Sequence, residues 1–283
     1  MALESVRVFC MEMFIDKNVD TPLTYRLWLE KALAKARLHY PKDNIHRLLV
    51  FPEFVSLPLI FNEDTFTKYI DEFIQLFSKM AVDEKAYILT CGPSRKNNKF
   101  YNEAFLFDPL GNCIFTTCKY NLTDEENILG FIPSVTPPKV ITLPFGVVGV
   151  AICLDAFSTP YIKSLKKLGA SIILQPSANP QSWLEKAKLS NVWQPLEWTK
   201  ATAGMVAPEN VPISYLINPM LRGLDKNGTY FDGQSSIVCA SSDFLSCPYQ
   251  GVTEKFQAKY VYCSSYENHS ESQIGWHTID GIL

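Results

Sequence analysis

Short apolar segments with the composition of β-strands alternate with amphipathic helical segments along most of this sequence. The clearest predicted strands are Val6–Met13, Arg47–Phe51, Tyr87–Cys91 and Ser171–Gln175. A helix over Pro22–His39 separates the first two strands, with apolar side chains recurring on one face. Strands interleaved with helices predict a layered α/β domain built from mixed sheets.

The remaining predicted elements continue this alternation. The other strands are the hairpin Tyr101–Asp108 with Cys113–Cys118, then Val140–Leu143, Val147–Cys153, Ile213–Asn218, Ser235–Cys239 and Tyr260–Tyr262. The other helices are Asp64–Met80, Pro160–Leu168 and a stretch from Pro180 to about Pro208 that Pro195 interrupts. No linker or repeat divides the 283 residues. We therefore expect a single domain over residues 1–283, in which residues 264–283 form a polar C-terminal tail lying on a surface.

Composition excludes several classes of function. Hydrophobic residues make up 47% of the chain, which argues against disorder. The net charge is −3, so no basic field is present to hold a nucleic-acid backbone. No run approaches the roughly 18 apolar residues of a membrane span, and charged residues interrupt every apolar stretch before position 21. We expect a cytoplasmic protein that binds neither nucleic acid nor a membrane.

The cysteines and histidines predict neither a metal nor a cofactor site. No two of the eight cysteines have CxxC spacing, which argues against a zinc site. No glycine-rich dinucleotide or phosphate motif and no HExxH motif occurs. The four histidines follow no strand end, so a serine or cysteine enzyme with a histidine base has little support.

Three reactive side chains directly follow predicted strands. Glu53 comes after an apolar strand, Lys119 after the hairpin, and Cys153 at the end of Val147–Cys153. Open α/β sheets place their ligands at the carboxyl ends of strands. Each residue also has an ordinary interpretation, as a solvated loop end, a surface lysine or a core thiol, and spacing alone does not decide between them.

The surrounding motifs extend over nearly the whole chain. The most informative are Leu49-Val-Phe-Pro-Glu-Phe around Glu53, Tyr101-Asn-Glu-Ala-Phe-Leu-Phe-Asp-Pro-Leu-Gly before the lysine, Lys119-Tyr-Asn-Leu-Thr, Gly149-Val-Ala-Ile-Cys-Leu-Asp around Cys153, and Gly169-Ala-Ser-Ile-Ile-Leu-Gln-Pro-Ser-Ala-Asn. In this order and spacing, they resemble the motifs of the nitrilase superfamily, the carbon–nitrogen hydrolases. The resemblance implies a four-layer α-β-β-α sandwich of two mixed sheets. It departs from the family after Cys153, where Ala156-Phe-Ser-Thr-Pro stands, and after Lys119, where Asn121 replaces a histidine common in the family.

The resemblance also implies a cysteine-dependent hydrolase with a Glu-Lys-Cys triad. Cys153 would be the nucleophile of a thioester intermediate. Glu53 would be the general base and acid, and Lys119 would stabilise the oxyanion together with the backbone N–H of Leu154. We also expect the positive charge of Lys119 to hold the nearby cysteine and glutamate as anions.

Two further residues complete the expected site. Many family members carry a second glutamate shortly after the lysine, and Glu126 lies seven residues after Lys119. Glu125 is the adjacent alternative, Asp124 is a third, and a solvated acidic loop is the ordinary interpretation. Asn179, at the end of the last motif, is expected to position the substrate. Asp155 is expected to be structural and to accept backbone N–H bonds.

These features predict hydrolysis of a non-peptide C–N bond in a small linear amide or N-carbamoyl compound, with no cofactor. Three alternatives remain. The thioester could be taken by an amine, which would make the protein an amide-forming acyltransferase. A catalytically silent dimerising scaffold would require a broken triad, and a glutaminase subunit would require a partner synthetase. The resemblance further implies a homodimer or higher homo-oligomer, with Tyr161–Leu168 and part of Trp183–Thr199 at a two-fold axis.

Overall fold

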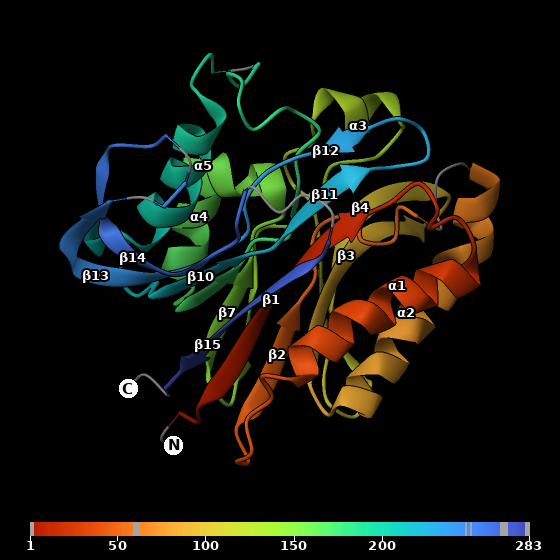
Figure 1. The fold of residues 1–283 in the computed structure, drawn as a ribbon, viewed down its shortest axis with the longest axis horizontal. Helices are drawn as coiled ribbons and strands as arrows, with labels where there is room; N and C mark the ends of the chain where they lie inside the picture. Colours follow the sequence, from red (N-terminus) through yellow and green to blue (C-terminus); the bar gives the residue numbers. More distant parts are fainter. Residues whose placement is uncertain are drawn as a thin grey trace.

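The strands of this protein form two sheets that pack face to face (Figure 1). A computed structural model describes residues 3–58, 63–188, 190–246, 248–249, 251–266 and 271–280. The helices are α1 (Pro22–Arg37), α2 (Glu63–Glu84), α3 (Asp124–Ile128), α4 (Thr159–Lys167) and α5 (Gln194–Thr202). The strands are β1 (Val6–Ile15), β2 (His46–Val50), β3 (Tyr87–Lys96), β4 (Lys99–Phe107), β5 (Cys113–Cys118), β6 (Val140–Leu143), β7 (Gly146–Val150), β8 (Ile172–Leu174), β9 (Ser177–Ala178), β10 (Tyr215–Asn218), β11 (Met220–Leu224), β12 (Tyr230–Phe231), β13 (Ser236–Ser246), β14 (Lys255–Cys263) and β15 (Gln273–Ile279).

Each sheet mixes parallel and antiparallel neighbours. The larger sheet runs β12-β11-β1-β2-β3-β4-β5, with β15 also paired to β1 and β9 to β11. In it β1, β2 and β3 are parallel, whereas β3, β4 and β5 are antiparallel. The smaller sheet runs β14-β13-β10-β8-β7-β6, with a parallel centre of β7, β8 and β10.

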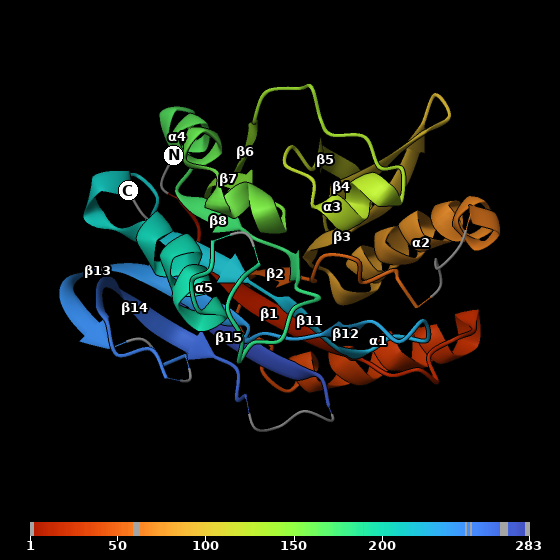
Figure 2. The ribbon, with the colours of Figure 1, turned by 90° about the horizontal axis from the view of Figure 1, so that it is seen from above.

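Helices cover the outer face of both sheets. One core cluster packs α1 and α2 against the larger sheet, and another packs α4 and its neighbours against the smaller sheet. A third cluster lies between the sheets and joins residues of β1 and β2 to residues of β7 and β8. Figure 2 shows α1 and α2 on the opposite side of the molecule from α4 and α5. The predicted four-layer α-β-β-α sandwich of two mixed sheets is confirmed.

Local sequence explains where the helices begin and end. Thr21 caps α1 by accepting a hydrogen bond from the backbone N–H of Thr24, whose side chain bonds back to the cap. The face of α1 that carries Tyr25 and Leu29 is buried. Gly169 follows α4 with a φ of +83°, a left-handed conformation that suits glycine at the end of a helix. None of the helices in the described part of the chain is long and apolar enough to cross a membrane.

The prediction of a helical stretch from Pro180 to Pro208, broken at Pro195, is wrong before Gln194 and in the break, whereas residues 194–206 are helical. Residues 180–188 and 190–193 form turns and a bridge, and α5 begins only at Gln194. Pro195 lies in the first turn of α5, where a missing backbone N–H has no helical partner to lose. The proline therefore starts this helix instead of interrupting it.

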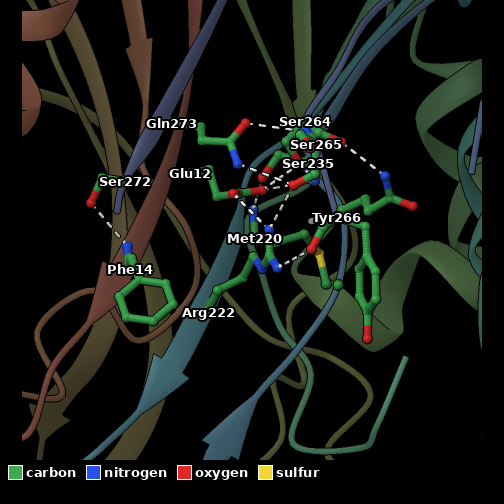
Figure 3. Close-up of polar contacts among 12 residues, drawn as sticks. Glu12, Phe14, Met220, Arg222, Ser235, Ser264, Ser265, Tyr266, Ser272 and Gln273 are labelled. Carbon is green, nitrogen blue, oxygen red and sulfur yellow. Dashed lines mark hydrogen bonds and ion pairs between the residues drawn. The ribbon is translucent and has the colours of Figure 1, made fainter. Parts of the chain in front are cut away.

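The C-terminal segment takes part in the larger sheet. β15 runs antiparallel to β1, with Val6 opposite Ile279 and Glu12 opposite Gln273. The sequence pattern did not reveal this strand. Figure 3 shows the polar cluster beside it, where buried Glu12 accepts hydrogen bonds from Arg222 Nη1 at 3.1 Å and Ser264 Oγ at 2.5 Å.

Candidate active site

Cys153 lies at a sharp bend between β7 and a 3₁₀ turn, Cys153–Phe157. Its φ is +45°, a conformation that side-chain-bearing residues rarely adopt and that clusters at functional sites. Its N–H donates to the Pro176 carbonyl at 2.9 Å, and Sγ lies 3.8 Å from the Ala178 carbonyl. The following strand, β8, and the loop after it therefore hold the bend in place.

Glu53 follows β2 and is buried beside Lys119. Its Oε1 lies 2.7 Å from Lys119 Nζ, and its Oε2 accepts the Ala178 N–H at 3.0 Å. Ala178 links this carboxylate to Cys153, because its N–H bonds to Glu53 while its carbonyl lies 3.8 Å from Cys153 Sγ. Lys119 comes at the end of the β4–β5 hairpin, and both charged side chains are 1% exposed. The three predicted triad residues are thus brought together, although they are far apart in the sequence.

Glu126 completes this cluster through the short helix α3. Its Oε2 lies 2.7 Å from Lys119 Nζ and accepts the N–H of Thr123, the residue that caps α3. Glu126 is buried, whereas Asp124 and Glu125 are exposed. The capping box therefore turns only the third carboxylate of this acidic run toward the lysine.

One member of the cluster, Asn102 of β4, was not predicted as a site residue. Its Nδ2 donates to Glu53 Oε1 at 2.7 Å and to Glu126 Oε1 at 2.6 Å. The only sequence signal was a polar residue within the motif Tyr101-Asn-Glu-Ala, in a strand otherwise rich in apolar residues.

Burial dominates the proton affinities of Cys153 and Glu53. It raises the pKa of the Cys153 thiol, the Glu53 charge raises it further, and the Lys119 charge only partly opposes these effects. Burial likewise raises the pKa of Glu53 against the opposing charge of Lys119. The expected attraction of Lys119 for both anions is present, but loss of hydration outweighs it, so the pKa of each group is raised and not lowered. The site is suited to passing one proton from the thiol to Glu53.

Lys119 itself stays charged. Burial lowers its pKa, but the charges of Glu53, Cys153 and Glu126 outweigh burial and raise the pKa well above its usual value. A fixed ammonium in a site of low hydration can stabilise a developing oxyanion far better than one in water.

Asp155 supports the loop that carries Lys119. Its carboxylate accepts the backbone N–H groups of Tyr120 and Asn121, at 3.2 and 2.7 Å, and the Asn121 side chain at 2.9 Å. Asp155 was expected to brace the bend at Cys153 by accepting backbone N–H bonds; the acceptance is confirmed, but the donors belong to the loop after Lys119. The asparagine that departs from the family pattern thus bonds to Asp155.

The two remaining predicted residues are Leu154 and Asn179. Leu154 follows Cys153 in the first turn of the 3₁₀ segment, where backbone N–H groups precede any helical acceptor. Asn179 donates from Nδ2 to the Gln181 carbonyl at 3.1 Å and accepts the Gln181 N–H at 3.3 Å. Its side chain is therefore engaged in its own turn, and no hydrogen bond among the described residues joins it to Cys153.

Residues 13–206 match the carbon-nitrogen hydrolase family, so the chain belongs to this family, within the nitrilase superfamily. Hydrolase C26A3.11 of Schizosaccharomyces pombe is 30% identical over 143 residues, 44% of this chain and 44% of that protein. The match thus spans less than half of this curated relative.

Solved structures share the fold. An amidase from Nesterenkonia sp. has a TM-score of 0.65 at 15% identity, covering 99% of this chain and 90% of the amidase. A mutant of the amidase from Nesterenkonia sp. AN1, with the acetamide moiety of fluoroacetamide added covalently at its active-site cysteine, has the same score at 14% identity and the same coverage. At these identities the likeness shows that this chain has the fold of those amidases.

Proposed function

We propose that this protein is a cysteine hydrolase that cleaves the non-peptide C–N bond of a small linear amide or N-carbamoyl compound. The observation that carries the proposal is the buried ion pair of Glu53 and Lys119, which Ala178 joins to Cys153 by bonding to Glu53 through its N–H and to Cys153 Sγ through its carbonyl. Membership of the carbon-nitrogen hydrolase family supports the reaction class. The structures of amidases with the same fold are consistent with an amide substrate.

In the first half of the proposed reaction, Glu53 accepts the thiol proton and Cys153 Sγ attacks the amide carbon. The carbonyl electron pair moves to oxygen, where the Lys119 ammonium and the Leu154 N–H stabilise the negative charge. The tetrahedral intermediate then collapses, the C–N bond breaks, and Glu53 returns its proton to the departing nitrogen. Ammonia or an amine leaves, and a thioester on Cys153 remains.

In the second half, a water molecule replaces the departed amine. Glu53 takes a proton from this water as its oxygen attacks the thioester carbon. The C–S bond then breaks, Glu53 returns its proton to the thiolate, and the carboxylic acid leaves, which restores the starting site. One carboxylate thus serves as base and then as acid in each half, which suits a group whose pKa is raised toward neutrality.

A substrate panel with detection of the acyl-enzyme tests this proposal. Linear amides, N-carbamoyl amino acids, ureas and nitriles are incubated with the protein, ammonia is measured, and intact mass spectrometry records adducts on Cys153. Cys153→Ala should abolish turnover and the adduct, whereas Cys10→Ala, which changes another buried thiol, should retain both. Full turnover by Cys153→Ala would refute the proposed nucleophile.

The same panel separates the alternatives. An acyl-enzyme that is released only when an amine is added would indicate an amide-forming acyltransferase. A folded protein that neither turns over nor accumulates an adduct with any substrate would favour a silent scaffold.

We also propose that the protein is a homodimer or a larger homo-oligomer. The helices that the resemblance assigns to a two-fold axis correspond to α4 and part of the segment that includes α5, and they lie on the outer face of the smaller sheet (Figure 2). Light scattering at micromolar concentration should report at least twice the 32.1 kDa of one chain. A mass of 32 kDa would contradict the oligomer.

A further inference from the structure

Asn102 connects the two carboxylates that flank Lys119. The side chain is 1% exposed, and its single Nδ2 atom donates one hydrogen to Glu53 and the other to Glu126. Its backbone carbonyl accepts the N–H of Lys119 at 2.8 Å. Asn102 therefore contacts three of the four charged or nucleophilic residues of the cluster, yet it carries no charge and no nucleophile.

Cys91, on the neighbouring strand β3, orients the Asn102 amide. Its Sγ donates to Asn102 Oδ1 at 3.3 Å, and its side chain is fully buried. Rotating the amide by 180° would place Oδ1 against two carboxylate oxygens, which are acceptors only. The carboxylates on one side and the thiol donor on the other thus select a single orientation.

We propose that Asn102 is a positioning residue that sets the spacing of Glu53 and Glu126 around Lys119, and that Cys91 fixes the orientation of its amide. This inference rests on the proposed function, because it assigns Asn102 a role in supporting Glu53 as the base. The amide holds two like charges close to one ammonium without adding a further charge to the site. A second lysine in its place would add such a charge, and an apolar residue would leave both carboxylates short of a donor.

The consequence is a change in how Glu53 titrates. The charged and titratable groups that face it are Lys119, Glu126, Cys153 and Cys91. A hydrogen bond donated to a carboxylate favours its charged form. Removing the Asn102 donor should therefore make Glu53 hold its proton to a higher pH, so that less enzyme carries a competent base near neutrality.

Asn102→Leu tests this inference because leucine has a similar size and no donor. We expect kcat to fall about 10- to 100-fold with KM within about threefold, since Asn102 holds the base and not the substrate. The acid limb of the kcat profile should move to higher pH by about one unit. The matched control is Leu106→Ala, a core change on the same strand that destabilises the protein without touching the cluster.

A second readout requires no substrate. The rate at which iodoacetamide alkylates Cys153, followed by peptide mass spectrometry against pH, reports the first proton lost from the Glu53–Cys153 pair. This inflection should also move upward by about one pH unit in Asn102→Leu and stay in place in Leu106→Ala. Profiles of Asn102→Leu that coincide with those of the wild type would overturn the inference.

The Cys91 variants test the second half of the inference. Cys91→Ser keeps a donor to Asn102 and should retain kcat within about threefold, whereas Cys91→Ala should show part of the Asn102→Leu effect on the pH profile. Identical profiles for the two variants would overturn the role of Cys91. Failure of the proposed function would give a different result, because Cys153→Ala would then keep its turnover. The alkylation profiles of the wild type and Asn102→Leu would still test the role of Asn102.

Discussion

Asp155→Asn tests how the lysine loop is held and what this support requires. The carboxylate is completely buried. Burial raises its pKa to about 6, although hydrogen bonds from Asn121 and Tyr120 act in the opposite direction. The charged form that accepts those hydrogen bonds is therefore maintained in the folded protein against a substantial loss of hydration.

The sign and size of the effect follow from this pKa. The pKa of Asp155 is 3.8 in the unfolded chain and about 6 in the folded protein, so the folded protein binds more protons than the unfolded chain between these pH values. Stability contributed by Asp155 is fully present below pH 3.8 and is lost as the pH rises through about 6. The difference between the two pKa values corresponds to a change of about 3 kcal/mol in the free energy of unfolding. Asparagine does not titrate, so the difference in unfolding free energy between wild type and variant isolates this effect.

Urea unfolding from pH 3.5 to 7.5 measures that difference. The unfolding free energy of the wild type minus that of Asp155→Asn should fall by about 3 kcal/mol across this range. Asp108→Asn is a control of opposite sign. Burial, the largest single cause, raises the pKa of Asp108, but the hydrogen bonds from Asn112, Leu110 and Gly111 together outweigh it and lower the pKa, so the stability that Asp108 contributes grows as the pH rises. A constant difference between wild type and Asp155→Asn would refute the reasoning.

The remaining predictions concern the charged cluster. Glu53→Gln and Lys119→Ala should each lower turnover at least about 100-fold, because one removes the proposed base and the other the charge proposed to stabilise the oxyanion; a folded Lys119→Ala protein with near-normal turnover would exclude that role. Glu126→Gln should lose amide turnover while its nucleophilic thiol still reacts with iodoacetamide, because the bond that orients the lysine is lost. Glu125→Gln changes an exposed side chain and should leave both measurements unchanged.

The parts of the fold that local sequence controls were predictable. The hairpin of β4 and β5 is confirmed because a turn sequence, Pro109-Leu-Gly-Asn, joins its two strands. The helix α1 is confirmed because its cap and its apolar face lie within its own residues. Strand ends likewise indicated Glu53, Lys119 and Cys153, which the structure brings together. Glu53 and Lys119 follow β2 and β5 of the larger sheet and Cys153 follows β7 of the smaller sheet, so the cluster forms where strand ends of the two facing sheets meet.

The features that were missed depend on partners distant in the sequence. β15 is short and half-polar, and its place is set by β1, more than 260 residues earlier. Asn102 gains its importance from Glu53 and Glu126, neither of which its own strand reveals. The balance of burial over charge at Cys153 required knowledge of how completely the site is enclosed. Local sequence patterns contain no information on these long-range contacts or on how completely they enclose the site.

The late position in the sequence of the residues that contact β1 has a consequence for synthesis of the protein. The buried carboxylate of Glu12 is made early, but its partners Arg222, Ser235 and Ser264 leave the ribosome more than 200 residues later. Until then β1 would carry an uncompensated charge in an apolar layer, which disfavours stable docking. The larger sheet therefore closes only after Ser264 and β15 have emerged. Until then nascent chains should stay open, with exposed strand edges that chaperones can bind.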